Sequence, residues 1–505
     1  MLKKRSTFFK ESLTLIVSNL TTGIFGFTFS ILISNKLGAE GMGLYGLIMP
    51  IYDLFICLIN GGMTAAISRN CAIYFGKNDF GNLHKTVEST LTFDTIWAII
   101  VVCFVFINSS YISSHIIKDP RSLKALRVMC PAMIFIALSA ILKGYFYSIS
   151  TSKIPAIIDI IEKGLRVVVF SIIIYSLNIS SVSGTVTTAY TTLTIGEFIS
   201  LIFLYIFYIK SKLKYKFNYK KSEDGLQLLF NVLIVSLPLC LNGFLTTALS
   251  TLSTLIIPRR LVSAGINYKQ ALALIGKFSN MALSIPLFPS IILISICTIL
   301  IPDLSESMSK GNYFSMENRI VKIIKIALIL SLSTLAICVA IPNELGFMFF
   351  NRKDLGNYIR FLSFSAPFVY VSTISYAILN GIGKQKILLR NSIIVSIEDL
   401  ILLYILTGLS FINIYGYGIT LIITSITSII LNFIEIKKYC FIKIDLHEKI
   451  IYTLCTVLVY LILNLLNNVI FIHNIYIKNI LIIFLGFLLM FMLINITNKN
   501  NRLAK

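Results

Sequence analysis

The fold class of this chain is decided by residues 476–496, YIKNILIIFLGFLLMFMLINI, where Lys478 is the one charged side chain. A run of about 20 apolar residues is long enough to cross a hydrocarbon core about 30 Å thick as an α-helix. Similar runs recur from Ser12 onwards along the whole chain. The sequence therefore predicts a polytopic membrane protein.

The composition excludes a water-soluble globular protein. Of the 505 residues, 56% are apolar and 13% are charged, and the mean hydropathy is +0.86. A soluble domain is about a quarter charged, because its surface must be solvated. The formal charge of +22 comes from cations in short loops between apolar runs, which is the pattern of the positive-inside rule. We therefore expect no nucleic-acid partner.

The nine cysteines do not form a recognisable site. They fall mostly within or beside apolar runs, and neither a CxxC motif nor a Cys/His cluster is present. The sequence thus predicts neither a metal site nor a disulfide framework, and small apolar packing residues are the expected role.

Hydropathy and turn signals predict an all-α fold with about 14 transmembrane helices. The predicted spans are 12–34, 44–68, 87–108, 123–148, 154–178, 184–209, 226–257, 269–300, 320–341, 359–380, 391–411, 416–436, 449–471 and 476–496. An even number of spans places both termini on the same side of the membrane. That side carries 28 of the 44 Lys and Arg residues, whereas 12 lie on the opposite side and 4 within spans. This excess predicts that both termini are cytoplasmic.

The loops between the predicted spans are short, none longer than about 20 residues. They leave no room for a nucleotide-binding or soluble catalytic domain, and the chain has no GxxxxGK[ST] phosphate loop. The sequence predicts a protein that acts within the membrane and is not an enzyme. No cofactor is expected, and an ion gradient or the membrane potential is the candidate energy source.

An internal repeat divides the predicted spans into two similar sets. Five pairs of residues recur at an offset of about 236 positions. They are Pro50 and Pro286, Gly76 and Gly311, Pro131 and Pro367, Gly144 and Gly381, and Glu162 and Glu398. We predict two six-helix lobes related by pseudo-two-fold symmetry, 1–222 and 223–440, followed by two extra C-terminal helices in 441–505. Secondary transporters are commonly built from such repeats, with a substrate site between them.

The densest group of charges within a predicted span is Glu162, Lys163 and Arg166. Glu162 and Arg166 are spaced i,i+4 with the acid first, the favourable order for an ion pair on a helix. A charged group inside a membrane marks function by default. The pair could line a water-filled cavity, or it could neutralise itself and simply help the helix to insert.

Other polar side chains within spans are candidates of different kinds. Asp53 follows Pro50 by three residues, in a helix that the proline is expected to distort. Asp94, Glu197 and Lys277 are expected near a membrane face, where solvation or snorkelling explains them. Two stripes of hydroxyls complete the set: Thr187, Thr191 and Thr194 in one span, and Thr247, Ser250, Thr251 and Thr254 in the next. Such hydroxyls suit a sugar or diphosphate ligand, but they equally satisfy their own backbone or mediate helix packing.

Several short motifs carry a resemblance to a known family. They are LGAEGMGLY at 37–45, PIY at 50–52, GYF at 144–146, IE…R at 161–166, IPRRL at 257–261 and IPDLSE at 301–306. Together they resemble the stage V sporulation protein B-like polysaccharide transporters of the multidrug/oligosaccharidyl-lipid/polysaccharide (MOP) exporter superfamily. That superfamily also contains the lipid II flippase MurJ and the MATE drug exporters. The chain departs from the family pattern in having no arginine in 25–34 and no acidic residue at Ser253.

The resemblance implies a flippase with a central cavity between two lobes. Its substrate would be an undecaprenyl-diphosphate-linked glycan, moved from the cytoplasmic to the outer leaflet by alternating access in cell-wall synthesis or sporulation. Besides this lipid, the implied partners are membrane lipids and a cell-wall synthase, and the implied location is the bacterial cytoplasmic membrane. The last two spans would form a groove for the polyprenyl tail.

A diphosphate needs cationic partners, preferably arginine, which binds such groups with two hydrogen bonds. The candidates are Arg166 and Arg69, with Glu162 orienting Arg166. The remaining candidate cavity residues are Asp53, Glu398, Thr247 and Thr251.

Two alternatives stay open at this point. The first is an ion-coupled, MATE-like exporter of small amphiphiles, whose cavity would be acidic and aromatic. The second is a polytopic glycosyltransferase or polymerase, which needs clustered carboxylates or histidines in a large extracytoplasmic loop. The longest such loops, 109–122 and 342–358, contribute few suitable side chains: His115, Asp119, Glu344 and Asp354.

Overall fold

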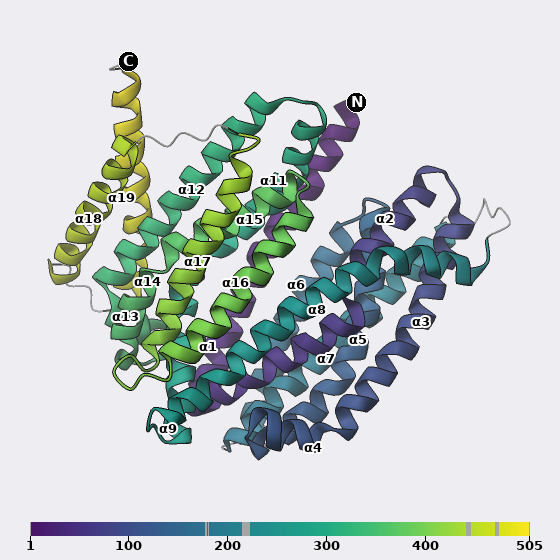
Figure 1. Cartoon of the computed structure of the whole chain (residues 1–505), viewed down its shortest axis with the longest axis horizontal. Helices are drawn as coiled ribbons and strands as arrows, with labels where there is room; N and C mark the ends of the chain where they lie inside the picture. Colours follow the sequence, from purple (N-terminus) through teal and green to yellow (C-terminus); the bar gives the residue numbers. More distant parts are fainter. Residues whose placement is uncertain are drawn as a thin grey trace. The chain divides into compact units, whose positions relative to one another are not determined.

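The computed structural model describes residues 2–176, 179, 181–214, 223–440, 446–469 and 474–503. Over these residues the secondary structure is entirely helical (Figure 1). The chain divides into two compact units, unit 1 (Met1–Ile256) and unit 2 (Ile257–Lys505). The boundary falls within α8 (Gly225–Ser263).

The elements of unit 1 that precede α8 are α1 (Leu2–Asn60), α2 (Met63–Gly76), α3 (Phe80–Ile107), α4 (Ser109–Tyr111), the π-helix η1 (Ile112–Ile117), the 3-10 helix η2 (Pro120–Ser122), α5 (Leu123–Ser148), α6 (Lys153–Ser176) and α7 (Val182–Lys214). The elements of unit 2 that follow α8 are α9 (Tyr268–Ile275), the π-helix η3 (Gly276–Ala282), α10 (Ser284–Leu287), α11 (Ser290–Ser309), α12 (Tyr313–Ala340), α13 (Pro342–Phe350), the 3-10 helix η4 (Lys353–Leu355), α14 (Gly356–Ser363), α15 (Ala366–Gly381), α16 (Gln385–Leu406), α17 (Tyr415–Ile436), α18 (Leu446–Val469) and α19 (Ile475–Leu503).

The helices confirm an all-α, multi-span membrane protein. Within the described residues, ten helical segments are long and apolar enough to cross a membrane, or eleven if the bent pair α14–α15 counts as one span. Two more helices, α6 and α16, have 24 and 22 residues but carry several charged side chains. The continuous run of α1 and α2 holds the first two predicted spans, because α1 turns at Gly38. The set is consistent with the predicted number of about 14.

Glycine and proline determine where these helices turn or break. Gly38 has φ 67° and ψ −172°, a conformation that residues with a Cβ rarely adopt, and it separates two helices that otherwise run together. The prediction of one continuous helix over 269–300 is wrong, because α9, η3, α10 and α11 replace it. Pro286 and Pro289 lie where α10 and α11 meet, and a proline has no N–H to continue the helical bonding.

The internal repeat is visible in the bounds of the elements. The pairs α3 and α12, and η2 and η4, begin and end 233 residues apart, close to the predicted offset of about 236. Gly144 of α5 packs against α2, where an added Cβ would lie 2.9 Å from the Thr64 carbonyl oxygen. Gly381 of α15 packs in the same way against α11, where its Cβ would lie 3.2 Å from the Ile301 carbonyl oxygen. The equivalent contact explains why glycine occurs in both copies.

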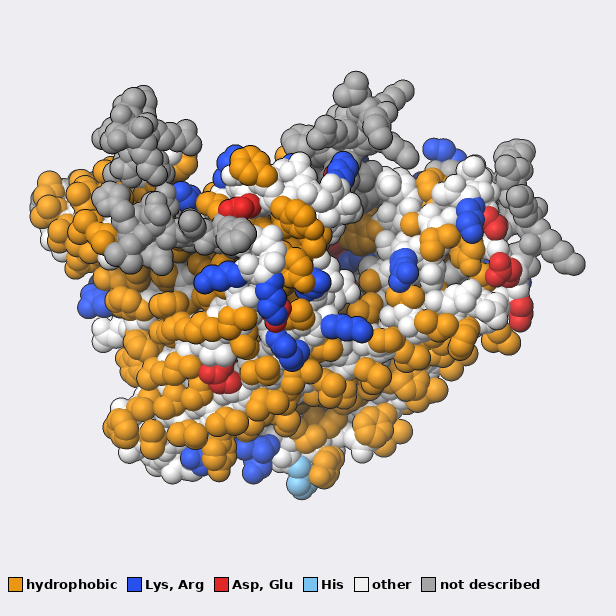
Figure 2. Space-filling model, turned by 45° about the horizontal axis from the view of Figure 1, so that its top comes forward, with side chains coloured by type: hydrophobic (Ala, Val, Ile, Leu, Met, Phe, Trp, Pro, Cys, Tyr) orange, Lys and Arg blue, Asp and Glu red, His pale blue; other side chains and the backbone are white. Residues whose placement is uncertain are grey.

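Each unit has its own apolar core and an apolar exterior. In unit 1 the core gathers around Tyr145 and Phe146 of α5, and in unit 2 around Tyr370 and Ile374 of α15. The exterior is also apolar, as Figure 2 shows for one face, and α3 alone exposes Ile100, Phe104 and Ile107. A surface of this kind suits a lipid environment.

The two C-terminal helices belong to unit 2. Both α18 and α19 pack on α12 and on each other. The division into 1–222, 223–440 and 441–505 stays a proposal, and both of its inner boundaries adjoin residues outside the described part of the chain.

Candidate functional site

Unit 1 contains a buried cluster of four charged side chains on α6 and α7. The Arg166 guanidinium donates a hydrogen bond from Nη2 to Glu162 Oε1 at 2.8 Å, and Nη2 lies 3.6 Å from Glu197 Oε1. Lys163 Nζ lies 2.7 Å from the other oxygen of Glu162. Glu162 and Glu197 are only 3% and 6% exposed. The predicted pair is therefore formed, and a carboxylate from a second helix joins it.

Local sequence explains how this cluster is built. Glu162 and Arg166 lie one turn apart on α6, so their side chains leave the same face of the helix. A glycine at 196 lets α7 approach that face, since an added Cβ would lie 2.9 Å from Glu162 Oε1. On its other side, the Arg166 guanidinium carbon lies 5.7 Å from the centre of the Phe29 ring of α1. This is a favourable cation–π arrangement.

The cluster is balanced in charge, which differs from the expected cationic lining. Two carboxylates face two cations. One turn earlier on α6, Asp159 forms a further pair with Lys143 of α5 at 2.7 Å, which leaves the balance unchanged. A self-neutralised group of this kind lowers the cost of placing charges in a membrane.

Arg166 nevertheless keeps unused hydrogen-bond donors. A guanidinium has five N–H groups, and the contacts described above use only those on Nη2. Its Nε is buried and has no hydrogen-bond partner, and the same is true of the Tyr52 hydroxyl. Tyr52 lies within electrostatic range of both Arg166 and Glu197. The site therefore offers unsatisfied polar groups of the type that an anionic oxygen would accept from.

The second half of α1 and the adjoining α8 hold three more of the predicted site residues. Asp53 is exposed, within electrostatic range of Cys57 and Tyr45. Thr247 is within hydrogen-bonding reach of the Cys57 thiol. Thr251 donates to the carbonyl oxygens of both Thr247 and Pro50, at 2.8 and 3.1 Å. The hydroxyl stripe on α8 thus satisfies backbone carbonyls, including the one at Pro50 of α1.

The remaining two predicted residues are not part of this cluster. Arg69 is exposed on α2. Among the described residues, no hydrogen bond or ion pair joins it to the cluster. Glu398, on α16 of unit 2, accepts a hydrogen bond at 2.9 Å from Thr427 of α17.

Comparison with known proteins identifies the family. The family model described as "Polysaccharide biosynthesis protein" matches residues 8–308, which is more than half of the chain. The chain belongs to this family.

Curated relatives of this polysaccharide biosynthesis family protein include a sporulation protein and a flippase. Stage V sporulation protein B of Bacillus subtilis (strain 168) is 22% identical over 449 residues, covering 88% of this chain and 86% of the relative. Lipid II flippase MurJ of the same organism is 21% identical over 467 residues, covering 86% and 83%.

Solved structures share the fold. Lipid II flippase MurJ in an inward closed conformation aligns with a TM-score of 0.69 at 14% identity, covering 97% of this chain and 99% of that one. A MATE family multidrug resistance transporter of the MOP superfamily, in an inward-facing conformation, aligns with a TM-score of 0.66 at 16% identity, covering 85% and 98%. The chain therefore has the fold of these membrane transporters.

From the sequence alone, the burial of two acidic residues was underestimated. Solvation or snorkelling was the expected explanation for Glu197 and Asp94, but they are 6% and 0% exposed. Glu197 is part of the charged cluster. Lys277, placed with them, is partly exposed in unit 2 and pairs with Asp354 at 2.7 Å. The spacing of α6 residues could not reveal Glu197, because it comes from another helix.

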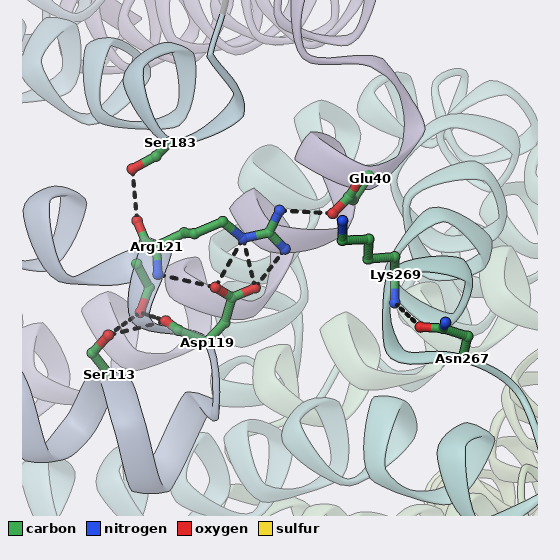
Figure 3. A network of polar contacts seen from close by, with 8 residues as sticks. Glu40, Ser113, Asp119, Arg121, Ser183, Asn267 and Lys269 are labelled. Carbon is green, nitrogen blue, oxygen red and sulfur yellow. Dashed lines mark hydrogen bonds and ion pairs between the residues drawn. The ribbon is translucent and has the colours of Figure 1, made fainter.

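A second polar network fixes the end of unit 1 at which α1 turns. Arg121 binds Glu40 through Nη1 at 2.7 Å and Asp119 through Nη2 at 2.8 Å (Figure 3). Its backbone carbonyl accepts from Ser183 of α7, and the carbonyl of Asp119 accepts from Ser113 of η1. These bonds tie α1, η1, η2 and α7 together. Because every charged group has a partner inside the network, we assign it a structural role.

Proposed function

We propose that this protein is a flippase that moves an undecaprenyl-diphosphate-linked glycan from the cytoplasmic to the outer leaflet by alternating access. The single observation that carries the proposal is the Arg166 guanidinium, held in the membrane-spanning part of unit 1 with a buried Nε that has no partner. The proposal is supported by the relatives, which include a lipid II flippase and a stage V sporulation protein. Cell-wall synthesis or sporulation is the proposed setting.

The cluster has a chemistry suited to binding and releasing an anion. Without substrate, Glu162 and Glu197 neutralise Arg166 and Lys163. A diphosphate oxygen competes with these carboxylates for the guanidinium, and charge-assisted hydrogen bonds of this type are strong and directional. When the substrate leaves, the carboxylates return, so the empty site never holds an unpaired cation. Glu162 and Glu197 would thus make both loading and release reversible.

The rest of the transport cycle follows from the membrane setting. We propose that the protein lies in the bacterial cytoplasmic membrane with both termini in the cytoplasm. A potential that is negative inside favours outward movement of an anionic headgroup. The polyprenyl tail stays in the lipid phase, and α18 and α19 are the proposed surface along which it moves. A cell-wall synthase is the proposed acceptor of the product.

Reconstitution tests this function directly. The full chain is placed in liposomes that contain a fluorescent polyprenyl-diphosphate disaccharide, and transbilayer movement is followed by quenching from outside. We expect Arg166→Ala to reduce the rate at least about tenfold, which corresponds to ~1.4 kcal/mol. Arg166→Lys should give an intermediate rate, because lysine keeps the charge but loses the planar pair of donors.

A matched arginine controls for the loss of a positive charge. Arg127 of α5 also lies over an aromatic ring, 5.6 Å from the centre of Phe106, but it is outside the cluster. Arg127→Ala should transport at nearly the wild-type rate. Equal rates for wild type, Arg127→Ala and Arg166→Ala would remove the site assignment. An inactive wild type would count against the function itself.

One feature favours the alternative of a small-amphiphile exporter. Arg166, which both glutamates contact, lies beside the Phe29 ring and within electrostatic range of Tyr45. The Tyr45 ring is tilted against that of Tyr190, with the ring centres 5.1 Å apart. An acidic, aromatic pocket suits an organic cation. Efflux of a fluorescent organic cation from the same liposomes, lost in Glu197→Gln and retained in Arg166→Ala, would favour this function over glycan transport.

A further inference from the structure

Asp94 of α3 is a membrane-buried carboxyl group with nothing to compensate its charge. Its side chain is 0% exposed, and neither carboxyl oxygen has a hydrogen-bond partner. An ionised carboxylate without a partner is very costly to bury, whereas a neutral carboxyl group costs far less. The structure therefore requires an explanation for Asp94 that the charged cluster on α6 and α7 does not supply.

Two contacts fix the position of Asp94 along the neighbouring helices. The Trp97 indole of α3 donates to the Leu58 carbonyl oxygen at 3.3 Å, and the Cys71 thiol of α2 lies 3.9 Å from the Leu83 carbonyl oxygen. Helix α3 therefore runs antiparallel to the chain of α1 and α2. Moving back along α3 from Trp97 to Leu83 corresponds to moving forward from Leu58 to Cys71. This register places Asp94 level with residues 60–61, where α1 ends.

The chain at that level is broken and tightly packed. Gly62 separates α1 from α2 in a left-handed conformation with φ 74°. A Cβ at Gly61 would lie 2.7 Å from the Cα of Cys240, so α8 touches the break directly. Trp97 of α3 and Cys240 of α8 both donate to the Leu58 carbonyl oxygen, which the end of the helix leaves free. Asp94 therefore lies beside a closed joint between α1 and α2.

The groups that face Asp94 from the helices around it are nearly all uncharged. From α8 the Cys240 thiol lies within electrostatic range of Asp94 and of the Cys57 thiol of α1. The register described above places Asn60, at the end of α1, at the level of Asp94. Leu138 and Leu142 of α5 line the same pocket as Leu91 and Thr95 of α3, and Lys143 of α5 is already paired with Asp159. On α3 itself Glu88 is paired with Lys212 of α7. Among the described residues no cation is placed to neutralise Asp94.

We propose that Asp94 is a proton-binding site whose protonation depends on whether the α1–α2 joint is packed against α8 or open. With the joint packed against α8, a carboxyl oxygen of Asp94 holds a proton taken from water, and the group is neutral. When the joint opens and water reaches the carboxyl, the O–H bond breaks and the proton passes to water. This proposal deepens the proposed function and rests on it for one consequence. If the joint opens during transport, the movement of the glycan is coupled to a proton gradient.

Infrared spectroscopy tests proton binding without any substrate. The full chain in liposomes at neutral pH should show the C=O stretch of a protonated carboxyl, shifted in D₂O, and this band should be lost in Asp94→Asn. Asp303→Asn, which removes a carboxylate paired with Arg319 in unit 2, should leave the band unchanged. Gly61→Ala forces the joint away from α8, so it should weaken the band while keeping Asp94 in place.

Each outcome decides the proposal. Identical spectra for wild type and Asp94→Asn would overturn it, and so would a band that appears only when Na⁺ is absent, because Asp94 would then be a cation ligand. If Asp94→Asn does not fold, Gly61→Ala decides whether a carboxyl at the joint binds a proton. A weaker band supports the proposal, and an unchanged band overturns it.

Transport supplies a separate readout. A pH gradient should change the rate of wild type several-fold and leave Asp94→Asn unaffected, and equal gradient dependence in both would overturn the coupling. If no glycan moves at all, the proposed function fails while the infrared result still stands.

Discussion

The α6–α7 pair of unit 1 and the α16–α17 pair of unit 2 occupy equivalent places in the repeat but use different chemistry. In unit 1, Glu162 is bound by Arg166 and Lys163, with Glu197 close by. In unit 2 the matching residue, Glu398, accepts a hydrogen bond from the Thr427 hydroxyl, and its second oxygen is buried without a partner.

The surroundings of Glu398 continue this difference. Asn391 of α16 donates to Asn432 of α17 at 3.0 Å, and Asn432 donates to Ser375 of α15 at 2.9 Å. Ser372 and Ser428 share a further bond at 2.9 Å. Around Glu398, unit 2 therefore joins its helices through neutral amides and hydroxyls, whereas the equivalent site of unit 1 uses ions. Further along the same two helices of unit 2, Arg390 of α16 and Glu435 of α17 form an ion pair at 3.4 Å. The two copies share a scaffold and differ at the site of Glu162 and Glu398, and we propose anion binding only for unit 1.

The largest expected effect on stability is that of Arg166→Ala. It leaves Glu197 without its cation, and breaking a buried ion pair by removing one partner typically costs about 3–5 kcal/mol. Thermal unfolding of the purified protein in detergent should show a clear decrease in melting temperature. A variant as stable as wild type would mean that water already solvates the cluster, and the contrast with unit 2 would disappear.

Substituting the two equivalent acids, Glu162 and Glu398, should lower stability by different amounts in the two units. Glu162→Gln removes a charge that two cations contact and should destabilise by about 2–3 kcal/mol, the upper range for single substitutions. Glu398→Gln changes a carboxyl group whose described partner is a hydroxyl, so it should cost less than about 1 kcal/mol. Equal melting temperatures for the two variants would contradict the assignment of ionic and neutral roles.

The fold and three of the four charged side chains of the cluster were predictable because their signals are local. Apolar runs define the helices, and glycine at positions such as 144 and 381 recurs where one helix touches another. The ion pair of Glu162 and Arg166 follows from spacing on a single helix. The burial of Glu197 and Asp94 was not predicted because it depends on contacts with other helices, of α7 with α6 and of α3 with the joint of α1 and α2. No spacing within one helix encodes such a contact.

The close approach of α7 to α6 can be tested through its glycine. In Gly196→Ala the new methyl group would lie 2.9 Å from Glu162 Oε1, so the carboxylate must move. Overpacking of this kind costs about 1–3 kcal/mol. Gly26→Ala is the matched control, since its Cβ would meet nothing within 4 Å, and it should be neutral or stabilise the helix by up to about 1 kcal/mol. A neutral Gly196→Ala would show that Glu162 is free to leave Arg166.

The smallest expected effect on stability is that of removing the Thr427 hydroxyl. This hydroxyl contacts Glu398 in unit 2, whereas cations contact the equivalent Glu162 in unit 1. Thr427→Val removes the hydrogen bond to Glu398 and keeps the shape of the side chain. Hydrogen bonds between membrane helices contribute about 0.6 kcal/mol on average, so a decrease of this size in unfolding free energy is expected. Thr424→Val is the control on the same helix, because Thr424 bonds mainly to the carbonyl of Thr420 in its own helix.

In the Glu398→Gln background Thr427→Val should cost about the same, since a glutamine oxygen accepts the same bond. A cost several times larger in wild type than in that background would show that Glu398 is ionised and that unit 2 also carries a charge within the membrane.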